Sequence, residues 1–398
     1  MFNKKACIVP WLHLTVNPNH KYKVCCHSDK PLNINASETS MEEALNSNLM
    51  ESIREKFINS EWPEECNICK LTEQNGMRSQ REIYNKTFKQ FIDSFDNIPK
   101  LQSVDLKFSN ECNLSCRMCS TTSSSKVNET IIDLKEKNIE LPTHWQGSTI
   151  WQDDKANLPT SLDQELKSLD LFKFKATGGE PTMQKRWLKL IDHYVDTQKC
   201  KHIILDFTTN GTKFNNNLLE KIKQFKKVRI RVSIDGYGET YNYIRYPFNW
   251  NMLEKRLNQL YEYVSLNNNI SIGISVLGQV YNIFNIGELW QFYDQINNKY
   301  NLSFDRSTFF IDYFLRPTKS EYNVNYLPYD LVENAYFKFK KEVNYTPLIQ
   351  DFENYLRICY NTKEEKHSEI KYSTAILDKH RDQSYKILHP QIVSYLNA

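Results

Sequence analysis

The sequence lacks long apolar runs, a large net charge and a secretory signal. No stretch approaches the roughly 20 consecutive apolar residues that a membrane-spanning helix needs. The net charge of +3 is too small to create a strong field for nucleic acid or for membrane surfaces. The N-terminal segment 1–5 is polar, and no apolar run follows it before Trp11. We therefore expect a cytoplasmic protein with neither a nucleic-acid nor a membrane partner.

The composition is that of a folded chain with two or three domains. Hydrophobic residues make up 40% and aromatic residues 13% of the 398 residues, which is too much for a disordered chain. At about 150 residues per domain, this length is ample for a sizeable buried core. Glycine is scarce, with only 10 residues, but this bias says nothing about chemistry.

Ten cysteines stand out in a chain that we expect to be cytoplasmic. Structural disulfides are disfavoured in that compartment, so metal binding or catalysis becomes the first interpretation. Five cysteines lie in the first 70 residues, three lie together in 112–119, and two are isolated. We expect the isolated Cys200 and Cys359 to be buried as small hydrophobic residues.

The apolar and turn-forming residues of segment 1–85 indicate a small folding unit that is separate from the rest of the chain. The predicted elements are a hairpin and a helix, over 12–16, 22–25 and 41–60. The hairpin brings Cys7 and Cys25 toward each other, and Cys66 and Cys69 follow on a turn. Because the unit has few apolar residues, it needs a cross-link between its segments to be stable.

From about residue 100 the pattern alternates between strands and helices. Six strands are predicted, near 104–108, 172–175, 202–209, 228–234, 271–276 and 304–315. Helices are predicted between them, over 183–197, 216–226, 252–266 and 284–299. Repeated strand–helix–strand units indicate a parallel sheet with helices outside.

Several of these strands alternate apolar with polar residues, as along 228–234. The strands of an open doubly wound sheet are buried on both faces and are more continuously apolar. A barrel with a polar interior explains the alternation better, and six strands suggest a partial barrel. The expected fold class is α/β, with a partial (β/α)6 TIM-like barrel over 100–320, an insertion at about 121–160 and a helical extension over 321–398.

The most informative motif is CxxxCxxC at Cys112, Cys116 and Cys119, directly after the first barrel strand. Three thiolates on one loop fit three corners of a [4Fe–4S] cluster and leave the fourth iron for a non-protein ligand. The alternative is a zinc site with a remote fourth ligand. The spacing alone favours the iron–sulfur interpretation.

Two further motifs follow later strands. Gly178, Gly179 and Glu180 come after the second strand, where glycines let the backbone approach a ligand and a carboxylate can meet an ammonium group. Ser233 ends the fourth strand and Arg245 follows, an arginine being the natural partner of a carboxylate. Taken singly, such glycines are common structural punctuation, and such an arginine is an ordinary surface residue.

Together and in this order, the motifs resemble the radical S-adenosylmethionine (radical SAM) superfamily over roughly residues 100–320. The resemblance implies that the methionine amino and carboxylate groups of SAM chelate the unique iron. It also implies that an external reductant supplies the electron that cleaves SAM to a 5′-deoxyadenosyl radical, which abstracts hydrogen from a substrate. The expected cofactors are therefore a [4Fe–4S] cluster and SAM.

The resemblance also assigns roles to single residues. The three motif cysteines hold the cluster, and the turn at 178–180 receives the methionine ammonium. The other expected SAM contacts are the carboxylate with Arg245, the carboxylate or ribose with Ser233, the ribose side with Asn210, and the adenine with Met118, where relatives often have an aromatic residue. No residue is assigned to chemistry on the substrate.

The N-terminal cysteines supply a second complete ligand set, Cys7, Cys25, Cys66 and Cys69. They resemble the auxiliary-cluster modules called SPASM and twitch. Here the module precedes the barrel and has ligands for one cluster, which favours twitch. The resemblance implies an auxiliary [4Fe–4S] cluster, with zinc as the alternative. Cys26 competes with Cys25, because adjacent strand residues face opposite ways.

The sequence narrows the substrate only to a class. If Ser233 points into the barrel, strand alternation places four basic residues there as well: Lys173, Lys175, Arg229 and Arg231. They would favour a polar or anionic substrate. The alternative is that these side chains reach water at the open end of the barrel. Relatives with such modules act on peptides, proteins and some small molecules, so we expect an oxidoreductase or a peptide-modifying enzyme.

Two alternatives to an enzyme remain: a non-catalytic iron–sulfur or zinc protein for electron transfer or sensing, and a partner-binding scaffold. The tail motif Leu377–Arg381 is similar to one in these relatives and has no assigned role.

Overall fold

The computed structural model describes residues 2–3, 5–28, 30–151, 157–302, 308–312, 321–361 and 366–398. Its internal contacts divide the chain into two compact units. The first unit comprises residues 1–110, 154–207 and 215–228, and the second comprises 111–153, 208–214 and 229–398. Both units are thus assembled from segments that are distant in the sequence.

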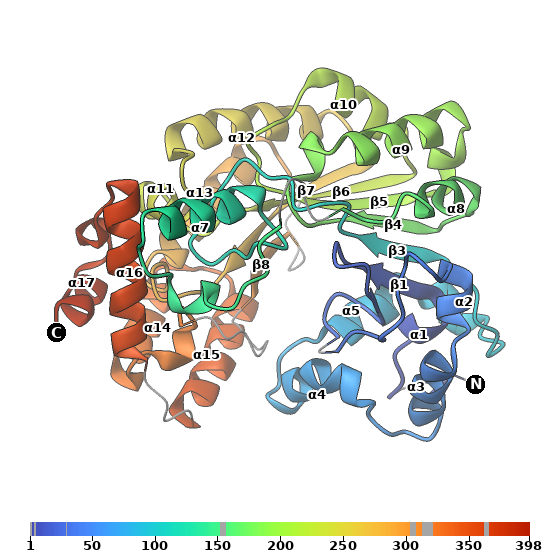
Figure 1. Cartoon of the computed structure of the whole chain (residues 1–398), viewed down its shortest axis with the longest axis horizontal. Helices are drawn as coiled ribbons and strands as arrows, with labels where there is room; N and C mark the ends of the chain where they lie inside the picture. Colours follow the sequence, from blue (N-terminus) through green and yellow to red (C-terminus); the bar gives the residue numbers. More distant parts are fainter. Residues whose placement is uncertain are drawn as a thin grey trace. The chain divides into compact units, whose positions relative to one another are not determined.

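The first unit combines five strands with short helices (Figure 1). Its strands are β1 (His13–Val16), β2 (Tyr22–Lys23), β3 (Ser103–Leu106), β4 (Lys173–Ala176) and most of β5 (Ile204–Thr209). Its α-helices are α1 (Val9–Leu12), α2 (Met41–Leu45), α3 (Asn48–Ile58), α4 (Asn67–Gln74), α5 (Gln80–Thr87), α6 (Lys89–Asp93), α8 (Leu162–Ser168), α9 (Lys185–Asp196) and α10 (Asn216–Ile222). Phe174 of β4 packs edge-on against Tyr194 of α9, with ring centroids 5.8 Å apart, so α9 covers one face of the strands.

The second unit holds the remaining strands and the longer helices. Its strands are β7 (Ile270–Leu277), β8 (Phe309–Asp312) and most of β6 (Lys227–Ser233), which begins in the first unit. Its α-helices are α7 (Ser125–Glu136), α11 (Glu239–Ile244), α12 (Trp250–Ser265), α13 (Ile286–Lys299), α14 (Tyr329–Glu342), α15 (Thr346–Asn361), α16 (His367–Arg381) and α17 (Pro390–Asn397). The part of the chain described beyond residue 321 is therefore mainly helical, as expected.

The strands form one open, mostly parallel sheet in the order β2-β1-β3-β4-β5-β6-β7-β8. Strand β2 is antiparallel to β1, whereas β1–β3, β3–β4, β4–β5 and β7–β8 are parallel pairs. The register aligns Leu14, Val104, Phe174 and Leu205 across four strands, and all four are fully buried. The α/β fold class with an open, partial barrel-like sheet is confirmed.

The six barrel strands expected from the sequence correspond to β3–β8. The four predicted helices between them are α9, α10, α12 and α13, with ends displaced by a few residues. For the last predicted strand, 304–315, the structure describes 308–312, of which 309–312 form β8; the rest lies outside the described residues.

The N-terminal hairpin is present, but it is not separate from the sheet. Thr15 pairs with Lys23 as predicted for a hairpin. In addition, β1 lies parallel to β3, with His13 opposite Ser103 and Val16 opposite Leu106. A strand of the expected N-terminal unit is therefore completed by backbone hydrogen bonds to a strand after residue 100.

Two local predictions need correction. The helix expected over 41–60 is two helices, α2 and α3, because the hydroxyl of Ser47 accepts a hydrogen bond from the backbone N–H of Met50 and starts a new helix. Cys66 and Cys69 are not on a turn. Cys66 ends a short 3-10 helix, and Cys69 lies within α4.

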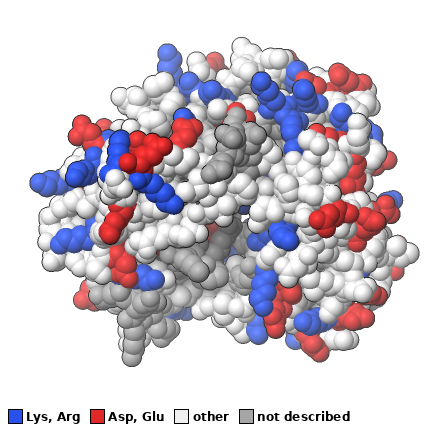
Figure 2. All heavy atoms as spheres, viewed as in Figure 1, with Lys and Arg blue, Asp and Glu red and all other residues white. Residues whose placement is uncertain are grey.

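The surface offers no concentrated charge on the face drawn in Figure 2, where basic and acidic side chains are interspersed. This distribution agrees with the small net charge of +3. Among the helices of the described residues, none has the length and apolar character needed to cross a membrane.

Candidate metal centres

Four N-terminal cysteines line one cavity in the first unit. Its cysteines are Cys7, Cys25, Cys66 and Cys69. They come from the segment before α1, the segment after β2, the 3-10 helix before α4, and α4 itself. The remaining lining is mostly apolar and aromatic, including Val9, Phe57, Trp62 and Tyr84. The fold thus gathers the four cysteines that the sequence analysis grouped, in a largely water-excluding pocket.

These four thiols are the donor set of two kinds of site. One zinc ion needs four sulfurs within about 2.3 Å of one point. A four-iron cluster offers a separate iron to each of four thiolates. The four cysteines that line the cavity therefore fit the donor set of either group.

Cys25 and Cys26 point to different surroundings. Cys25 lines the cavity, and Cys26 does not. The sulfur of Cys26 lies 3.6 Å from Nζ of Lys175 and 3.9 Å from the hydroxyl of Tyr84. The competition between the two adjacent cysteines is thus resolved geometrically in favour of Cys25 as the residue facing the cavity.

The cavity holds its thiols in their neutral form. Burial raises the pKa of Cys7 to about 12 and that of Cys69 to about 11. Burial also raises the pKa of Cys25 and Cys66, and the charges of neighbouring cysteines raise them further. Four thiolates would repel one another here, so a cationic group bound to them must displace their protons.

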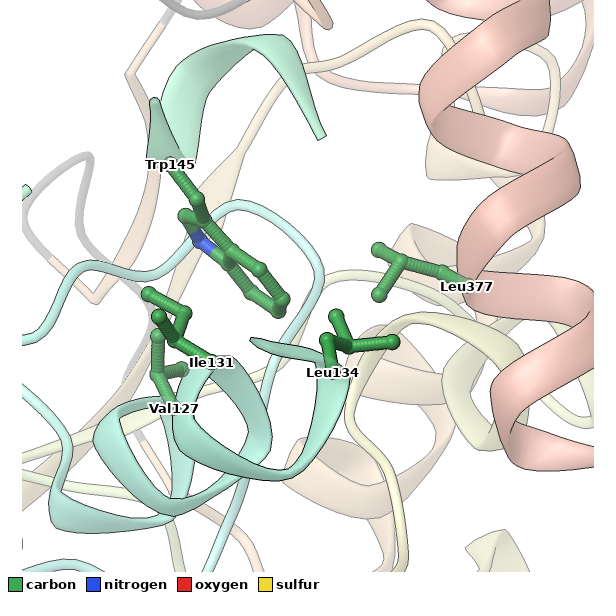
Figure 3. Packing of buried hydrophobic residues seen from close by; sticks show 5 residues of the cluster. All are labelled: Val127, Ile131, Leu134, Trp145 and Leu377. Carbon is green, nitrogen blue, oxygen red and sulfur yellow. The ribbon is translucent and has the colours of Figure 1, made fainter. Parts of the chain in front are cut away.

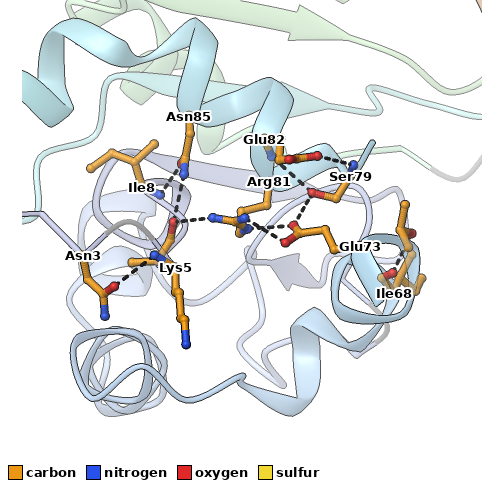
Figure 4. A network of polar contacts seen from close by, with 11 residues as sticks. Asn3, Lys5, Ile8, Ile68, Glu73, Ser79, Arg81, Glu82 and Asn85 are labelled. Carbon is orange, nitrogen blue, oxygen red and sulfur yellow. Dashed lines mark hydrogen bonds and ion pairs between the residues drawn. The ribbon is translucent and has the colours of Figure 1, made fainter. Parts of the chain in front are cut away.

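Arg81, which lines the cavity, forms a partly buried ion pair with Glu73 (Figure 4). Arg81 of α5 donates from Nε and Nη2 to the two carboxylate oxygens of Glu73, at 2.8 Å each, and from Nη1 to the carbonyl of Ala6 at 3.2 Å. Ser79 donates its hydroxyl to the same carboxylate at 2.6 Å. Since Ala6 precedes Cys7, Arg81 ties α5 to the first cysteine ligand of the proposed set.

The charged side chains on the strands of the first unit pair with one another. Lys175 lies 2.6 Å from the carboxylate of Asp105, and Lys173 lies 3.0 Å from that of Asp206. All four residues are largely buried. This burial argues against the alternative that the two lysines reach water at an open end, and two aspartates match their charge. They therefore give little support to an anionic substrate.

The glycine turn of the first unit is conformationally constrained. Gly178 and Gly179 have φ values of +74° and +56°, which L-residues rarely adopt. A Cβ at Gly178 would lie 2.7 Å from Cβ of Lys107. Glu180 is fully buried and its carboxylate accepts from the backbone N–H and the hydroxyl of Thr182, at 3.1 and 2.7 Å. The carboxylate that we expected to meet an ammonium group thus caps the short 3-10 helix Pro181–Met183.

In the second unit, the CxxxCxxC loop folds into a compact, buried patch. Cys112, Cys116 and Leu114 are buried together, and Met118 and Cys119 pack against them. The start of α7 holds the loop, because the Ser124 hydroxyl that caps α7 also donates to the carbonyl of Leu114 at 2.5 Å, and Ser125 bonds to the backbone of Cys112. The structure thus brings together the three cysteines and the methionine that the sequence singled out.

Cys116 and Cys119 too are neutral without a bound cation. Burial raises the pKa of Cys119, and the charges of Cys116 and Cys112 raise it further. Burial also raises the pKa of Cys116, partly offset by the positive charge of Arg245. Three clustered thiolates are the donor set of an iron–sulfur cluster, and the residues present fit that group.

Asn210 lies beside the loop rather than apart from it. Its side-chain amide donates to the sulfur of Cys112 at 3.7 Å and to the side-chain oxygen of Asn113 at 2.9 Å. Its own oxygen accepts from the backbone and hydroxyl of Thr212, at 2.9 and 2.6 Å. The sequence analysis assigned Asn210 to the ribose side of SAM and did not anticipate its contact with a motif cysteine.

Arg245 is buried and already has a carboxylate partner. Its Nε and Nη2 lie 2.8 and 2.7 Å from Oδ2 of Asp235. Burial lowers the pKa of Arg245, but the Asp235 carboxylate outweighs it and the net direction is upward. Asp235 follows β6 only two residues after Ser233, a half-buried residue at the end of that strand. Sequence reasoning gave Asp235 no role, although its place directly after a barrel strand was a usable signal.

The isolated cysteines behave as expected. Cys200 is fully buried and Cys359 is 3% exposed. Neither belongs to either group of clustered thiols. Trp145, in the expected insertion, is also fully buried among apolar side chains, so packing rather than exposure to a ligand describes it.

Comparison with known families identifies the barrel segment. Residues 106–282 match the Radical SAM superfamily. The match contains the cysteine loop, the glycine turn and Arg245, and it supports membership of that superfamily.

Similarity to curated proteins is limited to part of each chain. The radical SAM cyclopropyl synthase TigE of Paramaledivibacter caminithermalis is 24% identical over 170 residues, which cover 42% of this chain and 34% of that protein. An uncharacterized protein of Methanocaldococcus jannaschii is 27% identical over 137 residues, covering 34% of this chain and 39% of that protein. The chain therefore spans well under half the length of these curated relatives.

Two solved structures are similar at low identity. Native anSMEcpe with bound AdoMet is 17% identical with a TM-score of 0.39, covering 69% of this chain and 67% of that chain. Streptococcus suis SuiB bound to S-adenosylmethionine is 12% identical with a TM-score of 0.39, covering 88% and 72%. At such scores, the likeness carries no weight for function.

Proposed function

We propose that this chain is a radical SAM enzyme, starting from the match of residues 106–282 to that superfamily. The observation that carries the proposal is the buried patch of Cys112, Cys116 and Cys119 on one loop. A [4Fe–4S] cluster bound there supplies, from an external reductant, the electron that cleaves SAM to a 5′-deoxyadenosyl radical. Two buried thiols and a half-buried one form a suitable set of ligands for that group, and the Asn210 amide donates to one of these sulfurs.

The residues around the loop have separate tasks in this proposal. Arg245 has five N–H donors and gives two of its nitrogens to Asp235, so it can meet the methionine carboxylate as well. Met118 offers a polarizable surface to the adenine. Ser233 offers a hydroxyl to carboxylate or ribose. The turn at 178–180 receives the ammonium through its backbone, since the Glu180 carboxylate is engaged with Thr182.

A primary carbon radical attacks almost any C–H bond, so the protein must exclude water and hold one substrate hydrogen close to C5′. Burial of Cys112, Cys116 and Arg245 satisfies the first requirement. The remaining half of the task, orientation of the substrate, falls to residues outside the SAM contacts.

Production of 5′-deoxyadenosine tests the proposal. The chain is reconstituted with iron and sulfide without oxygen, then incubated with SAM and dithionite. The expected product is 5′-deoxyadenosine from the wild type and none from a Cys112→Ala, Cys116→Ala, Cys119→Ala variant. The matched control is Cys200→Ala with Cys359→Ala, which removes two buried cysteines outside the patch. A loaded wild type that yields no 5′-deoxyadenosine favours the electron-transfer or sensor alternative.

We also propose that Cys7, Cys25, Cys66 and Cys69 hold an auxiliary [4Fe–4S] cluster in a twitch-like arrangement. The shared cavity, which is lined by all four cysteines, supports this proposal. Loaded wild type should contain about eight irons per chain, and Cys66→Ala with Cys69→Ala about four. Stoichiometric zinc in place of the second four irons contradicts it.

For the substrate we propose a peptide or protein, modified by hydrogen abstraction. The proposal rests on the resemblance of the cysteine-rich N-terminal segment to modules in peptide-modifying relatives. The relative TigE is named a radical SAM cyclopropyl synthase. Candidate peptides deuterated at single residues should transfer deuterium into 5′-deoxyadenosine. If only small-molecule candidates transfer it, the peptide class is wrong.

A further inference from the structure

Helix α16 ends in the tail motif Leu377–Arg381, whose side chains converge on the cysteine loop. Leu377 is fully buried, Asp378 is 8% exposed and Arg381 is 5% exposed, whereas Lys379 between them is exposed. The motif therefore has one solvent-facing residue, Lys379, three residues that point into the second unit, and the half-buried His380.

Leu377 packs the helix against the segment that follows the cysteine loop (Figure 3). Its neighbours in one apolar cluster are Val127, Ile131, Leu134 and Trp145, with Cys119 packed against the cluster. The indole N–H of Trp145 donates to the carbonyl of Cys119 at 2.8 Å. The apolar side of α16 therefore contacts Trp145, which in turn binds the backbone of Cys119, the last cysteine of the CxxxCxxC loop.

Asp378 fixes the middle of the loop. Its Oδ1 accepts from Nη2 of Arg117 at 2.5 Å and from the hydroxyl of Tyr243 at 2.7 Å. Its Oδ2 accepts from the backbone N–H of Tyr385 at 2.7 Å. Arg117 stands directly after Cys116, is fully buried, and lies over the ring of Tyr243 at 3.6 Å.

Arg381 contacts the loop one residue before Cys116. Its Nη2 donates to the carbonyl and hydroxyl of Ser115, at 2.6 and 3.0 Å. Its Nε and Nη1 are buried and have no hydrogen-bond partner among the described residues. Burial and the charge of Arg117 lower the pKa of Arg381 to about 9, so it remains charged at neutral pH.

The charges near Cys116 do not balance. Arg117 pairs with Asp378, and Arg245 pairs with Asp235. Among the described residues Arg381 is bonded to neither carboxylate. Its guanidinium lies over the ring of Tyr246 at 5.1 Å, and its positive charge lowers the pKa of Cys116 against the larger effect of burial. One buried cation without a carboxylate partner therefore contacts the residue next to a proposed cluster ligand, where the dielectric is low and charges act strongly.

We infer that the tail motif is an electrostatic support for the cluster: Asp378 and Arg381 are positioning residues that hold the CxxxCxxC loop, and Arg381 stabilises the added negative charge when the cluster accepts an electron. This inference rests on the proposed radical SAM function. Positive charge next to a cluster raises its reduction potential, because the reduced state is the more anionic one.

The charge effect predicts opposite shifts for two variants. Arg381→Gln removes the unpaired cation and should lower the reduction potential of the cluster. Asp378→Asn removes the anion that neutralises Arg117 and should raise it. Mere loosening of the loop moves both variants in one direction, so opposite signs separate electrostatics from a structural role.

The measurement is a potentiometric titration followed by electron paramagnetic resonance on the anaerobically loaded full chain. The relevant signal is the one that Cys112→Ala removes. Arg381→Lys keeps the charge and should restore the wild-type potential, and Lys379→Gln removes a neighbouring exposed charge and should leave it unchanged. Iron content is measured on each variant, so that a variant that fails to load is recognised.

The outcomes separate this inference from the proposed function. If the wild type shows no signal that depends on Cys112, the proposed function fails. If the wild type shows that signal but Arg381→Gln keeps its potential, or shifts it in the same direction as Asp378→Asn, the electrostatic support is overturned. If Arg381→Gln does not bind the cluster, the other two variants decide. A raised potential in Asp378→Asn with a wild-type potential in Arg381→Lys supports the inference, and any other pair of results overturns it.

Discussion

Gly178 has a backbone conformation and a neighbour that exclude every larger residue. Its φ of +74° lies in the region that L-residues rarely adopt, and a Cβ would meet Cβ of Lys107 at 2.7 Å. Only part of this requirement was visible in the sequence, as two adjacent glycines after a strand. The clash with Lys107 depends on how β3 and β4 end side by side, which the register of the two strands decides.

Gly178→Ala is expected to destabilise the fold and weaken SAM binding. Left-handed backbone costs an L-residue about 1–2 kcal/mol, and the clash adds to it. Gly147→Ala is the matched control, because Gly147 has a φ of +71° but nothing within 4 Å of its Cβ position. Urea unfolding measures the free energy of unfolding, and equilibrium dialysis measures SAM. Equal losses in the two variants would show that the clash is unimportant.

The adjacent pair Cys25 and Cys26 gives a second residue-level prediction. Cys25 lines the cavity, and Cys26 contacts Lys175 and Tyr84. Cys25→Ser should lose about four irons per chain after reconstitution, whereas Cys26→Ser should retain them. Iron is measured against protein by colorimetric assay. The reverse pattern would move the ligand role to Cys26.

At the scale of elements, the parallel strands carry two polar rows on one face. One row aligns Thr15, Asp105, Lys175 and Asp206 across β1, β3, β4 and β5. A second begins with His13 opposite Ser103 and Lys173. Because side chains alternate along a strand, the polar rows follow from the sequence pattern, but the partners of each charge follow from the register alone.

His13 makes this face sensitive to acid. Burial lowers its pKa from 6.5 to about 3, and its ring nitrogens contact the hydroxyls of Ser103 and Thr15 at 2.9 and 3.3 Å. Between pH 6.5 and 3 the unfolded chain binds a proton at His13 and the folded chain does not. Stability therefore falls as the pH falls, by up to about 1.4 kcal/mol per pH unit from this group.

The comparison with His13→Gln isolates this contribution. The free energy of unfolding is measured by urea titration from pH 7 to pH 4. The variant should lose less stability over this range than the wild type, because glutamine does not titrate. Parallel curves for the two proteins would mean that His13 is protonated in the folded chain.

At the scale of the whole molecule, the N-terminal segment is part of the sheet. Strand β1 pairs along its whole length with β3, from His13–Ser103 to Val16–Leu106. A module that merely preceded the barrel would leave β3 at a sheet edge. Instead β1 and β2 extend the parallel sheet by two strands.

Deletion of residues 1–85 should therefore prevent folding of the remaining chain. The deletion exposes the hydrogen-bonding edge of β3 and the buried side chain of Val104. We expect an insoluble product or one without a cooperative thermal transition, measured by circular dichroism. A soluble, cooperatively unfolding product that still loads a cluster on Cys112, Cys116 and Cys119 would show that 1–85 is a separable module.

The sequence by itself determined the composition of the sites and the class of the fold. Cysteine spacing named both thiol groups, and the period of the apolar residues predicted six strands and four helices in the correct order. These features are local, because they depend on ligand spacing within a loop and on residues a few positions apart.

The tertiary structure decided which residues meet. Cys25 rather than Cys26 lines the cavity. Lys175 and Arg245 each form an ion pair with an aspartate. Arg381 contacts a loop that lies more than 260 residues earlier in the sequence. Such pairings depend on strand register and on helix packing between distant segments. No pattern along the chain encodes them, because each is fixed by the burial of both partners at once.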